Sequence, residues 1–174
     1  MTRIVLTGGP GVGKTTLIKA LSKKGYSTFN EAARKVIQKQ LELNTSNLPW
    51  DNVVEFSKLV LIEQIKDFNH KNEALIFYDR GIPDITGYLN HARKNKFKEL
   101  KKSCSLNRYD YVFILPPWKA IYTSDNERRE NFEEAKLIYN EIEQAYLSSG
   151  YKPILVPFDS IDNRINFILE KLNE

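Results

Sequence analysis

The chain has 174 residues, of which 41% are hydrophobic and 28% charged, and its formal net charge is +4. This length and composition predict one globular domain spanning residues 1–174, with enough chain to bury a full core. A single cysteine excludes a disulfide framework and a cysteine-based zinc site, and no apolar run reaches membrane-spanning length. We therefore expect a cytoplasmic protein without a membrane partner.

The basic residues are mostly interspersed with acids. The one basic cluster, at residues 94–102, is typical of a solvated helix face or loop. A mild excess of positive charge suits a protein that binds small anions such as nucleotides, and it gives little support to a nucleic-acid partner. Nothing in this pattern indicates an oligomeric state.

In chain order, short apolar runs alternate with stretches of helical periodicity. The apolar runs predict five strands, at residues 4–7, 27–30, 74–78, 111–115 and 153–156. The periodic stretches predict helices at residues 15–24, 31–43, 50–69 with Asp51 as its N-cap, 85–94, a long helix ending at 148, and one after Ser160 or Asp162. Because strands alternate with helices, we expect an α/β fold: a three-layer α/β/α sandwich around a five-stranded parallel sheet.

A glycine-rich turn follows the first expected strand. It has the spacing of the G-x-x-x-x-G-K-[ST] phosphate-binding loop, and a helical pattern follows at once. Glycines let successive backbone N–H groups surround a phosphate, and the positive end of the helix dipole adds to the attraction. The lysine of such a loop reaches the β- and γ-phosphates, and the threonine hydroxyl binds Mg²⁺. The residues expected to hold ATP, or GTP as the alternative, together with Mg²⁺, are Gly8, Gly9, Pro10, Gly11, Val12, Gly13, Lys14, Thr15 and Thr16.

Charged residues follow the second and third expected strands, at the end of the sheet where ligands bind. Glu31 can accept a hydrogen bond from a second substrate and Arg34 can bind an anionic group, or the two can form a local i,i+3 ion pair. Asp79 is a candidate for holding Mg²⁺ or for accepting a proton from an attacking hydroxyl. Arg80 is a candidate for binding a phosphate or an anionic acceptor, unless it pairs with its neighbour Asp79.

A highly charged segment at residues 124–130 precedes the long helix. A lid at about residues 122–132 would have this composition, with Arg128 and Arg129 closing over the phosphates and excluding water; the alternative is a solvated helix start. After the fourth strand, Trp118 lines a nucleotide or acceptor pocket, or it packs in the core. The stretches 31–69 and 84–102 are expected to shape the acceptor pocket.

Five segments together resemble one bacterial group of P-loop proteins. The group is the "AAA domain, ATPase family", related to the kinase domain of NadR-type nicotinamide riboside kinases, and the segments are 8–16, 30–34, 79–84, 116–118 and 125–129. The Asp79-Arg80 pair is similar to the acid-arginine pair of thymidylate and deoxynucleoside kinases. The resemblance implies the strand order 2-3-1-4-5. It also implies that Lys14 and Thr15 bind phosphate and Mg²⁺.

The same resemblance implies roles for the charged residues beyond the loop. Asp79 would supply the metal-side or base carboxylate, Arg80 and Glu31 would face the acceptor, and Arg128 and Arg129 would act as lid arginines. The features of an AAA+ machine are missing, because no Asp-Glu pair ends an apolar strand and no helical lid domain follows. We find no adenylyltransferase-like domain either, so the two-activity NadR architecture does not carry over.

These features favour a small-molecule kinase that transfers the γ-phosphoryl group of ATP, with Mg²⁺, to a nucleoside- or nucleotide-like acceptor. The alternative is an ATP- or GTP-binding NTPase that acts as a regulatory switch or binding module. The Asn-Lys-x-Asp motif of guanine-specific switches is missing after the fourth strand, where the sequence is Leu115-Pro116-Pro117-Trp118. A third reading, a nucleic-acid-associated ATPase, would use the basic cluster at residues 94–102. The acceptor itself stays open.

Overall fold

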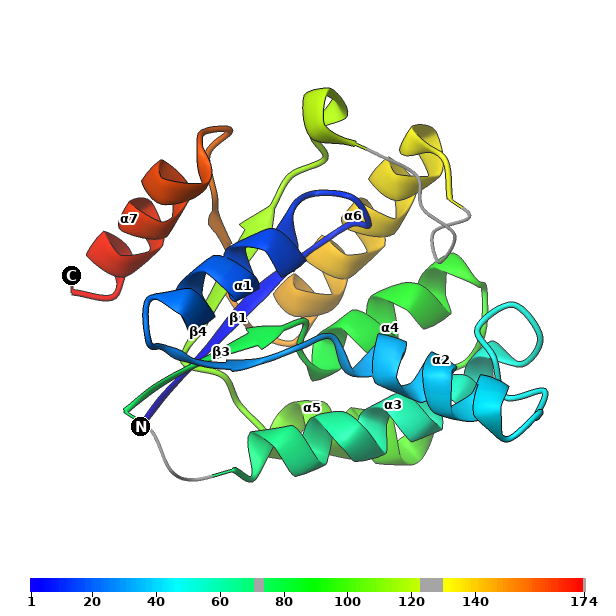
Figure 1. Ribbon diagram of the computed structural model, residues 1–174. Helices are drawn as coiled ribbons and strands as arrows, with labels where there is room; N and C mark the ends of the chain where they lie inside the picture. The colour runs from blue at the N-terminus through cyan, green and yellow to red at the C-terminus, as the bar shows by residue number, and fades with distance from the viewer. Residues whose placement is uncertain (71–73, 123–129, 174) are drawn as a thin grey trace.

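The computed structural model describes residues 1–70, 74–122 and 130–173, and its centre is a parallel five-stranded sheet (Figure 1). The strands lie in the order β2-β3-β1-β4-β5, which confirms the expected order. Their bounds are Thr2–Gly8 for β1, Ser27–Phe29 for β2, Leu75–Asp79 for β3, Tyr111–Leu115 for β4 and Ile154–Leu155 for β5. Strand β1 is central, and its residues Ile4, Val5 and Leu6 have no solvent exposure because both faces of the sheet are covered.

Two helical layers cover the sheet and complete the expected three-layer sandwich. Helices α1 and α7 share a buried apolar cluster with one face of the sheet, and helices α2 to α6 share a second cluster with the other. The helix bounds are Lys14–Lys23 for α1, Ala32–Glu42 for α2, Val53–Phe68 for α3, Ile82–His91 for α4, Lys98–Leu106 for α5, Phe132–Ser148 for α6 and Ile161–Lys171 for α7. A short 3₁₀ turn, η1, spans Lys119–Ile121. None of the helices in the described ranges is long and apolar enough to cross a membrane.

The structure corrects two helix starts. The N-cap of α3 is Asn52, whose side chain accepts a hydrogen bond from the Glu55 N–H, so the prediction of Asp51 as the cap was wrong by one residue. Helix α4 begins at Ile82 rather than at residue 85, because the Asp84 carboxylate accepts the Gly81 N–H at 2.9 Å and closes the first turn. This earlier start places Asp84 next to the loop that follows β3.

Helix α4 approaches α6 closely at Gly87. A Cβ atom at this position would lie 2.7 Å from the Ile142 Cα and 2.9 Å from the Ile142 N, both of them backbone atoms. Real Cβ contacts are not that short, so the two backbones can be this close only because position 87 has no side chain. Helix α4 also carries Asp84 and Tyr88, so this contact helps to set where those side chains lie.

Candidate active site

The glycine-rich loop between β1 and α1 has the backbone conformation that its sequence predicts. Gly8, Gly11 and Gly13 have φ angles of 133°, 74° and 89°, which L side chains rarely adopt. A Cβ at Gly8 would lie 2.3 Å from the carbonyl oxygen of Leu115 on the neighbouring strand. Gly13 is the N-cap of α1 and makes no side-chain cap, so the first N–H groups of the helix are left for another partner such as an anion.

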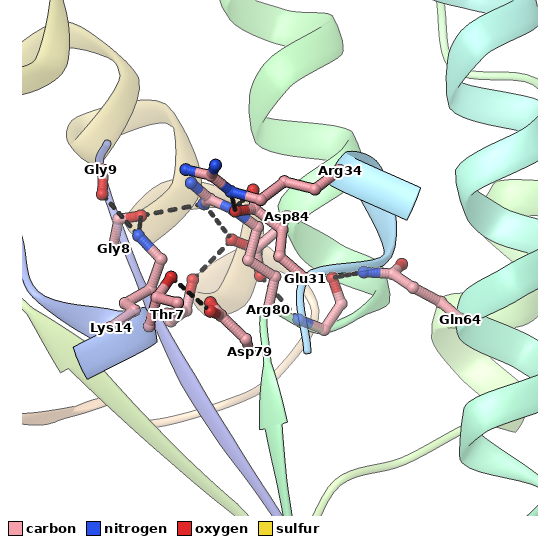
Figure 2. Close-up of polar contacts among 12 residues, drawn as sticks. Thr7, Gly8, Gly9, Lys14, Glu31, Arg34, Gln64, Asp79, Arg80 and Asp84 are labelled. Carbon is pink, nitrogen blue, oxygen red and sulfur yellow. Dashed lines mark hydrogen bonds and ion pairs between the residues drawn. The ribbon is translucent and has the colours of Figure 1, made fainter. Parts of the chain in front are cut away.

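Lys14 folds back over this loop. Its side chain is buried, and Nζ donates hydrogen bonds to the carbonyl oxygens of Gly8 at 3.0 Å and Gly9 at 2.6 Å (Figure 2). Burial, together with the nearby Arg80 charge, lowers the pKa of Lys14 to about 7. An anion near Nζ would restore the charged form, so the site favours a negatively charged ligand.

Asp79 ends β3 beside the start of α1. Its Oδ2 accepts a hydrogen bond from the Thr15 hydroxyl at 2.9 Å, whereas its Oδ1 is buried and has no hydrogen-bond partner among the described residues. Burial raises the pKa of this carboxyl to about 6, and the Glu31 charge acts in the same direction. A cation close to Oδ1 would relieve both the missing partner and the cost of the buried charge.

Arg80 is held by three acceptors rather than by its neighbour Asp79. Its guanidinium donates to Glu31 Oε1 at 2.7 Å, to the Gly8 carbonyl at 3.0 Å and to Asp84 Oδ1 at 3.1 Å. Its backbone has a φ of 73°, an uncommon conformation for a residue with a side chain. The buried guanidinium therefore has a fixed position between the phosphate loop and the acids of the next two elements.

Glu31 links the two arginines singled out in the sequence. Its Oε2 lies 3.3 Å from the Arg34 Nε, which is the local i,i+3 pair, while Oε1 bonds Arg80. Burial by itself would raise the pKa of Glu31, but the Arg80 charge outweighs it and holds the pKa at about 2. Glu31 is therefore a carboxylate at any physiological pH.

Sequence reasoning assigned no individual role to Asp84, which it mentioned only within the segments 79–84 and 84–102. The Asp84 carboxylate is buried and accepts four hydrogen bonds, from the Thr7 hydroxyl at 2.7 Å, the Arg80 guanidinium, the Gly81 N–H and the Tyr146 hydroxyl at 2.6 Å. Figure 2 shows Asp84 among Thr7, Gly8 and Arg80. The four-residue spacing from Arg80, one helical turn, was the sequence signal that could have found it.

A cavity of about 390 Å³ lies over the phosphate loop. Its polar lining includes the loop from Pro10 to Thr16 with Glu31, Arg34, Arg80 and Asp84, which brings most of the sequence-predicted site residues into one cavity. Its lining from α3 and α4 is mainly apolar, with Val53, Phe56, Val60, Ile85 and Tyr88. A cavity of this size and mixed lining fits a small organic ligand.

Gln64 is a second residue that the sequence did not mark as functional. It is buried on α3 and lines the same cavity. Its Nε2 donates to the Gly81 carbonyl at 3.2 Å, and its Oε1 has no partner among the described residues. The contact joins α3 to the loop after β3 (Figure 2).

The proposed lid arginines, Arg128 and Arg129, lie outside the described residues. The described residues on either side of that segment meet each other, because the Tyr122 hydroxyl donates to the Glu130 carbonyl at 2.6 Å. The Tyr122 ring also lies against the phosphate loop, since a Cβ at Gly11 would be 2.5 Å from a ring carbon. Tyr122 therefore lies against the loop, and Glu130 is bonded to it.

The sequence matches the family model described as "AAA domain" over residues 3–164, so the chain belongs to this family. No curated protein matches it.

Three solved structures show what the fold is similar to. Deoxyadenosine kinase from M. mycoides, with dCMP and dCDP bound, has a TM-score of 0.70 at 18% identity over 99% of each chain. Shikimate kinase from Acinetobacter baumannii, in complex with shikimate, has a TM-score of 0.64 at 15% identity over 99% of this chain and 94% of that one.

NadR protein in complex with NR is also similar, with a TM-score of 0.67 at 18% identity. The match covers 91% of this chain and 44% of the NadR chain, so this chain corresponds to less than half of that protein. At these identities the likeness establishes the fold, which is the P-loop fold of nucleoside kinases.

Proposed function

We propose that this protein is an ATP- and Mg²⁺-dependent kinase that transfers the γ-phosphoryl group to a nucleoside- or nucleotide-like small molecule. The observation that carries the proposal is that the phosphate loop and the buried Glu31–Arg80–Asp84 cluster line one cavity. A nucleotide hydrolase needs only room for a water molecule beside the γ-phosphate. This cavity also has an apolar wall, which a water molecule does not need and which suits an organic acceptor. The kinases among the similar structures support the same class of reaction.

The phosphate loop would hold the donor. Its backbone N–H groups and the N-terminus of α1 would surround the β-phosphate, and Lys14 would exchange its two carbonyl partners for phosphate oxygens. Lys14 is already buried at this position, so little reorganisation is needed when the phosphates arrive. Arg128 and Arg129 would close over the transferring group from the segment that follows Tyr122.

The Thr15–Asp79 pair fits a magnesium ion. A hydroxyl and a carboxylate are the hard oxygen ligands that Mg²⁺ prefers, and Asp79 Oδ1 is buried without a protein partner. No cluster of three or more acidic, histidine or cysteine side chains that could hold a metal occurs among the described residues, so phosphate oxygens and water would complete the shell. The ion would neutralise charge that develops on the phosphate oxygens.

The acceptor would be bound by four polar side chains, those of Glu31, Arg34, Gln64 and Arg80. Glu31, held ionised by Arg80, can accept a hydrogen bond from the acceptor hydroxyl and so aim its oxygen at the γ-phosphorus. Transfer forms the bond from that oxygen to the γ-phosphorus and breaks the bond to the β–γ bridging oxygen, which leaves as part of ADP. With a pKa of about 2, Glu31 is a weak base, so the hydroxyl proton would pass to Asp79, whose pKa is about 6, or, where Asp79 holds the metal, to an oxygen of the transferred phosphoryl group.

An acceptor screen tests the proposal. ADP release would be measured with MgATP and a panel of nucleosides, nucleoside monophosphates and small hydroxy acids, with the Lys14→Ala variant as the matched control. We expect one chemical class to raise ADP release at least tenfold over the basal rate, and no stimulation in the variant. If no acceptor in the panel stimulates the enzyme while a protein partner does, the regulatory NTPase is the correct reading.

A further inference from the structure

The basic residues between the end of α4 and the middle of α5 take no part in the chemistry proposed above. Residues 93–102, here called the basic segment, have six cationic side chains and one acidic side chain, so their formal net charge is +5. The whole chain carries +4, so the rest of it carries only −1. The excess positive charge of the protein therefore belongs to this one segment. Its cations are Arg93, Lys94, Lys96, Lys98, Lys101 and Lys102.

The fold exposes all six of these cations to solvent. Leu100 anchors α5 in the apolar core with no solvent exposure, and Phe97 packs against the same cluster. Among the residues that the structure describes, no carboxylate forms an ion pair with any of the six. None of the six lines the active-site cavity. The basic segment is therefore a charged surface of its own, separate from that site.

The placement of the lysines on α5 opposes the stability of the helix. Lys98 lies in the first turn, and Lys101 and Lys102 follow it at three and four positions, which puts all three on neighbouring turns. Like charges at these spacings repel each other, and cations near the N-terminus of a helix interact unfavourably with its dipole. The last turn, where a cation would be favourable, has no basic residue. Helix stability alone therefore does not explain this arrangement.

Arg93 adds a second cost, because its backbone has a conformation that favours glycine. It follows α4 with a φ of 54°. Its N–H donates to the Asn90 carbonyl at 2.9 Å, and the N–H of Lys94 donates to the Leu89 carbonyl at 2.8 Å, so the turn is fixed by the end of the helix. A side chain in this conformation is strained. Residues that break local rules without a compensating contact are expected where they serve a function.

We propose that the basic segment binds the phosphate backbone of a nucleic acid, independently of base sequence. Five of its six cations are lysines, which act as compact point charges on a flexible stem. Neutralisation of successive phosphates by such charges, with release of counterions, is sufficient for sequence-independent binding. The proposal does not depend on the proposed kinase activity.

Two other kinds of partner fit this surface less well. The cores of protein–protein interfaces are depleted in lysine, which is the main residue here. A segment that binds an anionic membrane surface also needs apolar side chains that insert into it, and residues 93–105 have no exposed large apolar side chain. A phosphate polymer requires only the cations.

Fluorescence anisotropy with a short labelled single-stranded RNA and a short labelled DNA duplex tests the proposal. We expect at least one of them to bind with a Kd of roughly 10 μM at low salt. Contacts to about five phosphates predict that log K falls with log salt at a slope of about −3.5 for the single strand and −4.5 for the duplex. Excess MgATP should not compete. Failure of both probes to bind at low salt would overturn the proposal.

A triple variant, with Lys98→Gln, Lys101→Gln and Lys102→Gln, should weaken binding about tenfold or more and reduce the salt slope by about 2 to 3. Because repulsion between the three lysines is removed, it should melt at or above the temperature of the parent. The matched control removes the same charge from three exposed lysines of α1, on the other face of the sheet, and should change affinity less than about threefold. It combines Lys19→Gln, Lys23→Gln and Lys24→Gln.

Arg93→Gly separates binding from stability in a single substitution. Glycine relieves the strained backbone, so the melting temperature should rise, whereas loss of one cation should weaken binding and reduce the salt slope by about 1. A fall in melting temperature with unchanged binding would contradict both parts of the argument.

Three further outcomes would overturn the proposal. Equal losses of affinity in the two triple variants would show that net charge, rather than this segment, attracts the polymer. Competition by MgATP would place the nucleic acid in the active-site cavity. Binding to vesicles of phosphatidylserine and phosphatidylcholine, without binding to either nucleic acid, would identify a membrane surface as the partner.

Discussion

The guanidinium of Arg80 donates to the carboxylate of Glu31 across 2.7 Å, and this contact joins the loop after β3 to the loop after β2. The side chains of both residues are largely buried, at 6% and 15% exposure, and both line the cavity over the phosphate loop. The pair therefore does two things at once: it keeps Glu31 ionised, and it holds together two walls of the cavity in which we propose that the acceptor binds. A change to either residue should affect both stability and acceptor binding.

Glu31→Gln is expected to lower the free energy of unfolding by about 3 kcal/mol, because it leaves the buried Arg80 charge with one carboxylate fewer. The stability that Glu31 provides should be present above pH 4.5 and should be lost as pH falls toward 2, since the pKa of Glu31 is about 2 in the folded protein. Urea denaturation at pH 7 measures the first effect, and a pH series measures the second. Arg34→Gln is the control: its partly exposed contact to Glu31 should cost less than about 1 kcal/mol. Equal losses in the two variants would show that burial of the Glu31–Arg80 pair does not increase its contribution to the free energy of unfolding.

Lys14→Met should abolish nucleotide binding and leave the fold intact. The substitution keeps the unbranched side chain and removes a charge whose burial is costly, and that cost is the main reason that the pKa of Lys14 is lowered to about 7. We expect a melting temperature at or above that of the wild type and no heat of ATP binding in calorimetry. Normal ATP turnover by this variant would show that the glycine-rich loop is not the nucleotide site.

The pH dependence of kcat/KM should be bell-shaped and narrow. Asp79 must be ionised to hold a metal ion, and its pKa of about 6 predicts a fall in rate of about tenfold per pH unit below that value. Lys14 must be protonated to attract phosphates, and its pKa of about 7 in the free protein predicts a similar fall above that value. Bound phosphates stabilise the charged lysine, so the alkaline limb of kcat should lie at higher pH than that of kcat/KM.

The Asp79→Asn variant separates the two roles of this residue. If Asp79 holds the metal, the variant should need at least tenfold more Mg²⁺ for half-maximal rate, and the acid limb at pH 6 should disappear. If Asp79 is the base, the acid limb should disappear while the Mg²⁺ requirement stays unchanged. Thr15→Val, which removes the hydroxyl that donates to Asp79 Oδ2, is the companion variant and should raise the Mg²⁺ requirement in either case.

The sequence predicted the parts of the site that lie close together along the chain. The spacing of Gly8, Gly13, Lys14 and Thr15 alone predicts a glycine-rich turn, and the two glycines have the positive φ angles that such a turn needs. Alternation of apolar runs with helical periodicity similarly predicted the strands and the layers. Local pattern was sufficient in both cases because backbone conformation is decided largely by neighbouring residues.

The residues that the sequence missed depend on contacts between distant elements. Arg164, which is buried and lines the cavity, is 152 positions from its partner Val12, and Asp84 is 62 positions from Tyr146. Nothing local distinguishes Arg164 from an ordinary basic residue in the first turn of a helix, and its burial follows only from where α7 packs against α1. The sequence pattern likewise places Gln64 only on the apolar face of a long helix. Its contact with the loop after β3 follows from the packing of α3 beside that loop.

The close contact between α4 and α6 gives a prediction in which two effects oppose each other. Gly87→Ala improves helix propensity by about 1 kcal/mol, but the added methyl group would meet the Ile142 backbone at 2.7 Å, and overpacking of this kind costs about 1–3 kcal/mol. Because backbone atoms cannot rotate away as a side chain can, we expect a net loss of about 1–2 kcal/mol in urea denaturation. Asn90→Ala, on the same helix and half-buried, should instead gain a few tenths of a kcal/mol. Since α4 also carries Asp84, Gly87→Ala should raise the KM for the acceptor more than that for ATP, and a gain in stability from this substitution would show that α6 can shift away.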